Sequence, residues 1–308
     1  MKRALLVVNP KATTITVRAR DVVASALASA SRLEVVETKA RGHASELARS
    51  AALDGLDVVV ALGGDGTVNE VVNGLLADGP GPGLPALAVV PAGSTNVFAR
   101  ALGLPNAPVE ATAVLLEALH AERRRTVGLG TADERWFTFN AGMGLDADVV
   151  RRVDHQRARG SRSTPALYVR SGFRQFFTST DRRRPALLLE RPGAEPEPLG
   201  LALVCNAAPW TYLGPRPVLP CPQASFDSGL DLFGLRSLGT LPTLWHLKQI
   251  LAARGARPHG RRVVGVHDAA ELVLSARSPQ PFQVDGEDLG DRTRVVLRSV
   301  PRALSVVV

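Results

Sequence analysis

The sequence predicts an α/β N-terminal domain with a parallel sheet and a C-terminal antiparallel β-sandwich domain. In the first part, short apolar runs without polar alternation are each followed by a helix-period pattern, which indicates parallel strands buried on both faces. From Thr126 onward, many short strands follow one another without long helices between them, which is typical of an antiparallel sandwich or barrel. A chain of 308 residues with 45% hydrophobic content can form two such cores. We therefore expect a first domain at 1–127, to which a closing strand at 300–308 can return, and a second domain at 128–299.

Composition limits the class of partner and the compartment. The formal net charge is +8, and only four of the basic residues are lysines. Such a charge suits anionic lipid surfaces, nucleotides or nucleic acid, but nucleic acid is the weaker choice because few aromatic residues accompany the arginines. Two cysteines without metal spacing and no expected signal peptide predict a cytoplasmic protein. No apolar run reaches the roughly 18 residues of a membrane span, so any membrane contact should be peripheral, on the inner face.

A glycine-rich loop joins a buried strand at 58–62 to an amphipathic helix that we expect to begin near Val68. Glycines between a strand and a helix let backbone N–H groups approach an anion, and the helix N-terminus favours negative charge. The loop lacks the Lys-Ser/Thr pair of a Walker A motif and the third glycine of a dinucleotide fingerprint. Because the carboxylate of Asp65 would repel phosphate, its presence predicts Mg²⁺ or water between the two. An ordinary tight turn with an aspartate cap is the alternative.

A second loop of the same design follows the strand at 86–90, where Pro91-Ala92-Gly93-Ser94-Thr95-Asn96 precedes a helix at 97–102. Two loops at the carboxyl ends of strands in one open sheet face one crevice, the usual ligand position in this architecture. By itself, this loop would be interpreted as a well-capped helix start.

These segments resemble the diacylglycerol kinase catalytic domain family, which includes bacterial lipid kinases and sphingosine kinases. GGDGTVNEVVNGL resembles its nucleotide-binding signature, and PAGSTNVFARALGLP resembles its PxGTxNDFARxLG segment, with Val97 in place of the frequent aspartate. The loop after the first strand resembles an NPxSG loop near the ATP phosphates, with Ala12-Thr13 replacing Ser-Gly. NAD kinases and phosphofructokinases share the GGDG core, which implies an α/β domain of that kind. The nucleotide contacts that the resemblance implies are Asn9, Pro10, Lys11, Thr13, Thr38, Gly63, Gly64, Asp65, Gly66, Thr67, Asn69, Glu70, Gly93, Ser94, Thr95 and Asn96.

Asp285-Gly286-Glu287 is the third segment that carries the resemblance. By itself, it would be a hairpin turn. The family has a DGE here whose last residue is assigned as proton acceptor, which implies Glu287 as the base, with Asp285 and Asp65 as the other catalytic residues. The stretch 225–230 resembles one in which carbonyls and an aspartate bind a supporting Mg²⁺, but Ser228 stands at the aspartate position, so we expect a weak or empty site unless Asp227 substitutes. The implied metal ligands are Asp65, Ser225, Asp227, Ser228 and Leu230.

The resemblance implies an ATP- and Mg²⁺-dependent lipid kinase, a transferase of phospholipid biosynthesis that phosphorylates the primary hydroxyl of diacylglycerol or a related lipid alcohol at a membrane surface. One alternative is a soluble-substrate kinase of the NAD kinase type, which would share the GGDG loop. Another is a lipid or nucleotide sensor without catalysis, suggested by the departures at Ala12, Val97 and Ser228. The basic region 151–184 includes a possible helix at 165–178 that is equally compatible with a membrane-surface helix and with a solvated helix packed on its own domain.

Overall fold

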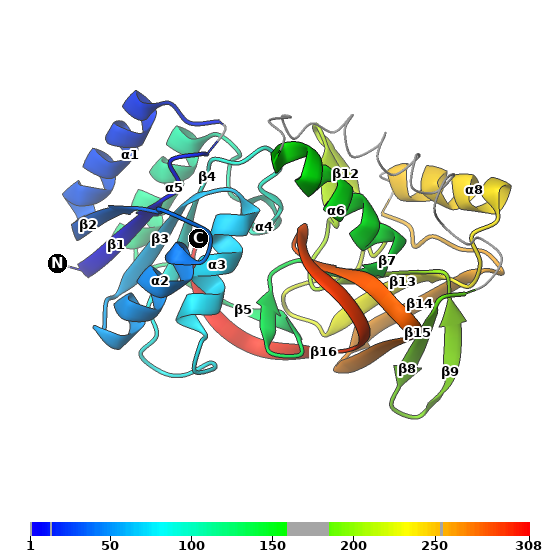
Figure 1. Ribbon diagram of the computed structural model, residues 1–308. Helices are drawn as coiled ribbons and strands as arrows, with labels where there is room; N and C mark the ends of the chain where they lie inside the picture. The colour runs from blue at the N-terminus through cyan, green and yellow to red at the C-terminus, as the bar shows by residue number, and fades with distance from the viewer. Residues whose placement is uncertain (1, 13, 159–184, 253–254) are drawn as a thin grey trace. The chain divides into compact units, whose positions relative to one another are not determined.

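The structure is a computed structural model that describes residues 2–12, 14–158, 185–252 and 255–308 (Figure 1). The chain divides into two compact units. Unit 1 comprises Met1–Gly128 with Arg302–Val308, and unit 2 comprises Leu129–Pro301.

Unit 1 is built on a parallel sheet with the strand order β16-β4-β3-β1-β2, in which the last residues of β16 pair with β4. All six residues of β3 are buried, as expected for a mid-sheet strand without polar alternation. The register places Leu6 of β1 opposite Val35 of β2 and Val60 of β3. The strands are β1 (Lys2–Val8), β2 (Ser31–Glu37), β3 (Val58–Gly63), β4 (Ala86–Pro91) and β16 (Glu287–Val307).

Helices follow the strands of unit 1 in the alternating order that a parallel sheet requires. They are α1 (Val17–Ala30), α2 (His43–Leu53), α3 (Asp65–Leu75), α4 (Val97–Ala101) and α5 (Pro108–His120). Local signals fix several helix starts: the side chain of Thr16 accepts a hydrogen bond from the N–H of Ala19, and Pro108 stands in the first turn of α5. Helix α3 begins at Asp65, three residues before the expected Val68, because the carbonyl of Gly64 already accepts from the N–H groups of the first turn.

Unit 2 is antiparallel, with the strand order β14-β13-β10-β7-β15-β16 and with β8 and β9 continuing from β15. One core lies among these strands and contains the fully buried rings of Phe137 and Phe282. A second cluster, around Phe233, includes Ile250. The strands are β5 (Arg124–Ala132), which begins in unit 1, β6 (Arg135–Phe137), β7 (Asn140–Gly144), β8 (Leu187–Arg191), β9 (Ala194–Leu199), β10 (Leu201–Cys205), β11 (Thr211–Leu213), β12 (Arg216–Val218), β13 (Leu230–Leu235), β14 (Val263–Ala269) and β15 (Glu271–Val284).

The predicted fold class is confirmed: an α/β unit with a parallel sheet is followed by an antiparallel β-rich unit. The expectation that no long helices interrupt the second domain is wrong, since α6 (Leu145–Ala158) and α8 (Thr240–Leu251) lie within it. The sequence did not reveal α8 because its apolar residues do not form a single stripe: Leu244 and Leu247 are exposed, whereas Ile250 is buried. The expected helix at 165–178 lies outside the described residues. Among the helices that the structure describes, none has the length and apolar character needed to cross a bilayer.

Candidate functional site

In unit 1, hydrogen bonds tie together the loops that follow β1, β3 and β4. The N–H of Asn9 donates to the carbonyl of Leu62 (3.0 Å), and the N–H of Ala92 donates to the carbonyl of Gly63 (2.8 Å). The N–H of Thr14 also donates to the carbonyl of Ala92 (3.3 Å). Because parallel strands place their carboxyl ends at one edge, the predicted nucleotide loops form one connected surface there.

The two glycine loops touch each other through their backbones. A Cβ built on Gly93 would lie 2.6 Å from the Cα of Gly64, a distance that no side chain could tolerate without a backbone shift. A Cβ on Gly66, in the first turn of α3, would meet nothing within 4 Å. The glycines therefore have different roles: Gly64 and Gly93 allow the loops to approach, whereas Gly66 leaves open space beside the N-terminus of α3.

Asp65 is the first residue of α3, and its Oδ1 accepts a hydrogen bond from the N–H of Phe98 in the first turn of α4 (3.1 Å). A carboxylate at helix N-termini is stabilised by the orphan N–H groups and the helix dipole. The expectation that Asp65 sits in the loop before the helix is therefore wrong, because Asp65 is the first residue of α3 and its side chain joins two helix starts.

Asn96 holds the second loop in shape. Its side chain is buried and accepts from the N–H of Gly93 (2.8 Å), and its amide donates to the carbonyl of Gly93 (2.9 Å) and to the side chain of Asn106 (2.8 Å). Its φ of 52° is left-handed, a conformation that asparagine tolerates better than most residues. In a similar way, Asn9 donates to the hydroxyl of Thr67 (3.1 Å) and links the first loop to α3.

Asn69 and Glu70, two further residues predicted to contact the nucleotide, form hydrogen bonds within the protein. Asn69 is buried and accepts from the side-chain amide of Asn73 (3.1 Å), and Glu70 accepts from the N–H of Ala44 in the first turn of α2 (3.2 Å). The other predicted contacts of these loops lie at or near the surface: Pro10, Lys11 and Ser94 are exposed, Thr38 and Thr95 are half-buried, and Thr13 lies outside the described residues. Their contact with a nucleotide stays a prediction.

The predicted metal ligands differ in how well they suit Mg²⁺. The part of the chain that the structure describes contains no group of three His, Cys, Asp or Glu residues that could hold a metal ion. Asp65 still fits the usual magnesium arrangement of kinases, in which one or two carboxylates act together with substrate phosphates. The segment at 225–230 does not fit, because the carbonyl of Ser225 already accepts from both the N–H and the hydroxyl of Ser228 (3.1 Å each).

In unit 2, a two-residue turn joins β15 to β16 and presents Glu287. Val284 pairs with Glu287, and the two residues between them have positive φ, 48° at Asp285 and 79° at Gly286. Positive φ at both positions is the pattern of a type I′ hairpin turn, for which glycine is suited at the second position.

The carboxylate of Asp285 anchors this turn to the connection between β6 and β7. It is buried and accepts four hydrogen bonds, from the N–H of Thr138 (2.7 Å), the hydroxyl of Thr138 (2.9 Å), the N–H of Phe139 (2.9 Å) and the N–H of Asn140 (3.1 Å). A carboxylate in this setting is a structural acceptor, so the contacts favour an anchoring role for Asp285 rather than direct chemistry.

A buried polar chain lies behind the turn. The amide nitrogen of Gln283 donates to Asp146 (2.7 Å) and Asn140 (3.1 Å), and its carbonyl oxygen accepts from the N–H of Gly286 (2.9 Å). Burial raises the pKa of Asp146 to about 7, against the smaller opposing effect of the hydrogen bond from Gln283. The sequence reasoning did not find this chain, although a glutamine between Phe282 and Val284 in an apolar strand is a usable signal.

Glu287 is itself mostly buried and forms an ion pair with Arg135, whose Nη2 lies 3.1 Å from Oε2. Next to it, Asp288 pairs with Arg151 of α6 (3.0 Å). Both pairs join residues more than 130 positions apart, so nothing in the sequence pattern pointed to Arg135 or Arg151.

Unit 2 also contains a pocket of about 890 Å³ beyond the other end of β7. Its apolar lining comes from Gly144, Leu145, Pro185, Ala186, Leu187, Leu188, Pro198, Gly200 and Ala276, and its polar lining from Asp148, Ser275, Arg277, Ser278 and Gln280. Gln280 lies four residues before Val284 along β15, a separation of about 13 Å at the usual rise of a strand.

Comparison with known proteins relates this chain to lipid kinases. Residues 3–132 match the family model described as diacylglycerol kinase catalytic domain. A diacylglycerol kinase of Bacillus subtilis is 40% identical over 108 residues, which cover 35% of this chain and 33% of that protein. A diacylglycerol kinase of Staphylococcus aureus is 29% identical over 256 residues, 81% of this chain and 74% of that protein.

Solved structures agree on the fold. The crystal structure of a diacylglycerol kinase from Bacillus anthracis has a TM-score of 0.71 at 21% identity and covers 99% of this chain and 96% of that one. An NAD kinase from Archaeoglobus fulgidus, solved in complex with ATP, has a TM-score of 0.53 at 10% identity. The match covers 99% of this chain and 93% of the NAD kinase chain. The match to the Bacillus subtilis protein spans a third of its length. The similarity to the diacylglycerol kinase catalytic domain family that the sequence predicted is confirmed over residues 3–132.

Proposed function

We propose that the protein is an ATP-dependent lipid kinase that phosphorylates the primary hydroxyl of diacylglycerol or a related lipid alcohol. The observation that carries the proposal is the contact between Gly64 and Gly93, which brings two strand-end loops and the N-termini of α3 and α4 together. Such an arrangement offers backbone N–H groups and helix dipoles to an anion, and the open space at Gly66 leaves room for phosphates.

The choice of a lipid acceptor has two supports. The relatives from Bacillus subtilis and Staphylococcus aureus are both named diacylglycerol kinase. In addition, half of the residues that line the pocket of about 890 Å³ in unit 2 carry apolar side chains, which suit an acyl chain better than a soluble dinucleotide. An acyl chain held there would extend over about 13 Å of β15 to reach the turn.

The residues of this chain would have separate roles in phosphoryl transfer. Glu287, held by Arg135 and by the anchored turn, would orient the acceptor hydroxyl and take its proton. Phosphoryl transfer has a loose transition state, so alignment and charge neutralisation supply most of the acceleration. Mg²⁺ bound with the nucleotide would neutralise phosphate charge, and Asp65 is the residue suited to hold it. Asp285 and Gln283 would fix the turn rather than contact the substrate.

One assay tests this proposal against the two alternatives. Labelled ATP with Mg²⁺ is presented in turn with diacylglycerol micelles, a sphingoid base, ceramide and NAD. Transfer to diacylglycerol is expected, with the product identified by mass spectrometry. Transfer only to NAD would replace the proposal with a soluble-substrate kinase, and tight ATP binding without transfer to any acceptor would indicate a sensor.

A further inference from the structure

Helix α8 carries four of its large apolar side chains on the outside of unit 2. Four of the ten exposed large hydrophobic residues in the described part of the chain lie on this one helix: Leu241, Leu244, Trp245 and Leu247. Leu241 is 80% exposed and Trp245 is 47% exposed, whereas the polar residue His246 is buried, with only 3% of its surface exposed. This distribution is the reverse of that on an ordinary surface helix, which buries its apolar stripe.

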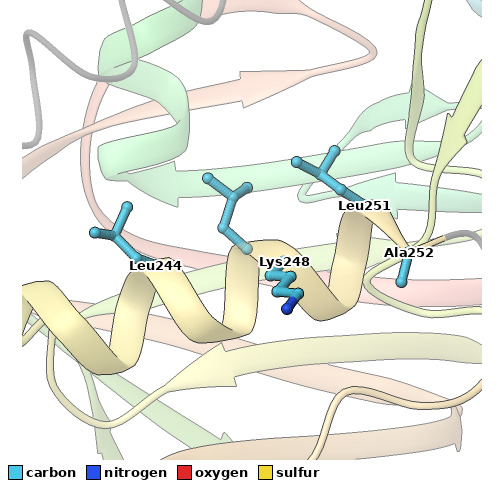
Figure 2. A pocket seen from close by; sticks show the side chains of 5 residues that line it. Leu244, Lys248, Leu251 and Ala252 are labelled. Carbon is cyan, nitrogen blue, oxygen red and sulfur yellow. The ribbon is translucent and has the colours of Figure 1, made fainter.

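The outer face of α8 forms a shallow groove of about 420 Å³, lined by Leu244, Leu247, Lys248, Leu251 and Ala252. Figure 2 shows Leu244 and Leu251 projecting from the same side of the helix, with Lys248 between them along the helix. The inner face is fixed by Ile250, which belongs to the second core cluster, and the partly buried Leu251 also packs against that cluster. The helix is therefore anchored on one side and presents leucines on the other.

Cationic residues are held beside this apolar face. The stretch 236–267 contains six lysines or arginines and no aspartate or glutamate. The side-chain amide of Gln249 bonds both the N–H of His259 (3.0 Å) and its carbonyl (3.2 Å), so the segment after α8 is clamped alongside the helix. His259 also contacts the ring of Trp245, with the ring centroids 5.4 Å apart. The exposed cations of this region are Lys248 on α8 and Arg257, Arg261 and Arg262 in the clamped segment.

We propose that the outer face of α8, together with the basic segment 255–262, is a docking surface for an anionic lipid bilayer. Leucine and tryptophan side chains beside cations are the composition of helices that lie in the membrane interface, where the apolar groups enter the acyl boundary and the cations contact anionic headgroups. The charge pattern selects a bilayer over a second copy of the chain, because two copies would bring like charges together. The inference deepens the proposed function, since it states how a lipid kinase would reach its substrate.

The test measures binding of the protein to vesicles by flotation, without ATP and without an acceptor lipid. One set of vesicles contains equal parts of phosphatidylcholine and phosphatidylglycerol, and the other contains phosphatidylcholine alone. We expect strong binding to the anionic set only. Leu241→Ser should lower the vesicle partition coefficient about tenfold, the loss expected when one leucine side chain stays in water. Lys248→Gln should lower it about fivefold, and added salt should weaken binding.

Two matched variants in unit 1 serve as controls. Leu53→Ser removes a leucine that is 73% exposed on α2, and Arg32→Gln removes an exposed cation on β2. Both should bind vesicles as the unchanged protein does. Equal binding of Leu241→Ser and the unchanged protein would overturn the inference, as would equal binding to both vesicle sets. A change in oligomeric state by light scattering, with vesicle binding unaltered, would reassign the surface to self-association and also overturn it.

Failure of the docking surface and failure of the proposed function give different results. Leu241→Ser should keep full turnover with a water-soluble short-chain diacylglycerol and lose turnover only with diacylglycerol in anionic vesicles. A protein that binds vesicles through α8 but transfers phosphate to no lipid would contradict the proposed function and leave the docking surface intact. Normal turnover of the variant on vesicle-embedded diacylglycerol would contradict the docking surface alone.

Discussion

The carboxylate of Asp65 accepts a hydrogen bond of 3.1 Å from the backbone N–H of Phe98, so the first residue of α3 caps the first turn of α4. The side chain of Asp65 thus has two roles: it holds two loops together, and it is the carboxylate that suits a nucleotide-bound Mg²⁺. The two roles can be separated by substitution.

Asp65→Asn retains an acceptor oxygen for the N–H of Phe98 and removes the charge. We expect near-normal stability with a loss of turnover of at least about a hundredfold. Asp65→Ala removes the acceptor as well and should in addition lower the free energy of unfolding by about 1 kcal/mol, the usual effect of a lost cap. Urea denaturation and kinase assays on both variants provide the measurement. Normal turnover of Asp65→Asn would exclude a role for the charge.

Gly66→Ala tests the open space beside α3. In a helix, alanine is more favourable than glycine by up to about 1 kcal/mol, and the new Cβ would meet nothing within 4 Å, so stability should stay the same or rise. If phosphates occupy that space, the same Cβ should weaken ATP binding about tenfold. The control is Gly81→Ala, an exposed position in unit 1 whose Cβ also meets nothing within 4 Å. Calorimetry should show unchanged ATP affinity for the control; unchanged affinity for Gly66→Ala would remove phosphate from this space.

Asp285→Asn tests whether this residue anchors the turn. Its carboxylate accepts three backbone N–H groups and one hydroxyl, whereas an amide would present an NH₂ group to at least one of these donors. We expect the free energy of unfolding to fall by about 3 kcal/mol, since a buried charged acceptor is lost. Asp291→Asn, which breaks only an exposed pair with Arg151, should change stability by less than about 1 kcal/mol. Lost turnover of Asp285→Asn at unchanged stability would indicate direct chemistry instead.

Asp146 predicts a pH dependence of stability. Its pKa is raised by burial from 3.8 to about 7, so within that window the folded state holds a proton that the unfolded state has released. Its contribution to stability is therefore lost as the pH rises from about 4 to about 7, and the loss is complete above that. A shift of this size corresponds to on the order of 4 kcal/mol.

Asp146→Asn removes this titration and can still accept the hydrogen bond from Gln283. Urea denaturation at pH 5 and pH 8 should show that the variant gains stability relative to the unchanged protein as the pH rises. Parallel curves for the two proteins would show that Asp146 does not titrate in this window.

Glu287→Gln tests the base. The variant is nearly isosteric but cannot take a proton, so kcat should fall by about 10² to 10⁴-fold, and the loss can lie at the lower end because much of phosphoryl transfer is alignment. ATP affinity should not change, since the nucleotide loops belong to unit 1. Glu271→Gln, which breaks the exposed pair with Arg298 in unit 2, is the control and should keep full turnover. Full turnover of Glu287→Gln, or loss of kcat and ATP affinity together, would remove Glu287 from the role.

The sequence alone determined the features that depend on local chemistry. Apolar runs without alternation identified β3 and β4 as buried parallel strands, and the periodicity of Val68, Val71 and Leu75 identified α3. The Asp-Gly pair identified the turn before Glu287, because few dipeptides accept positive φ at both positions. The resemblance carried by the GGDG segment gave the family, which the match over residues 3–132 confirms.

Only the tertiary structure decided which polar side chains are engaged in holding the fold. Asp65 with Phe98, Asp285 with Thr138, and Glu287 with Arg135 are partners separated by 33, 147 and 152 positions. No local pattern encodes such pairs, because a hydrogen bond depends on where packing places the two groups. The outward face of α8 belongs to the same class: its leucines would suit a core as well as a surface, and only the packing of Ile250 and His246 against unit 2 decides which face remains exposed.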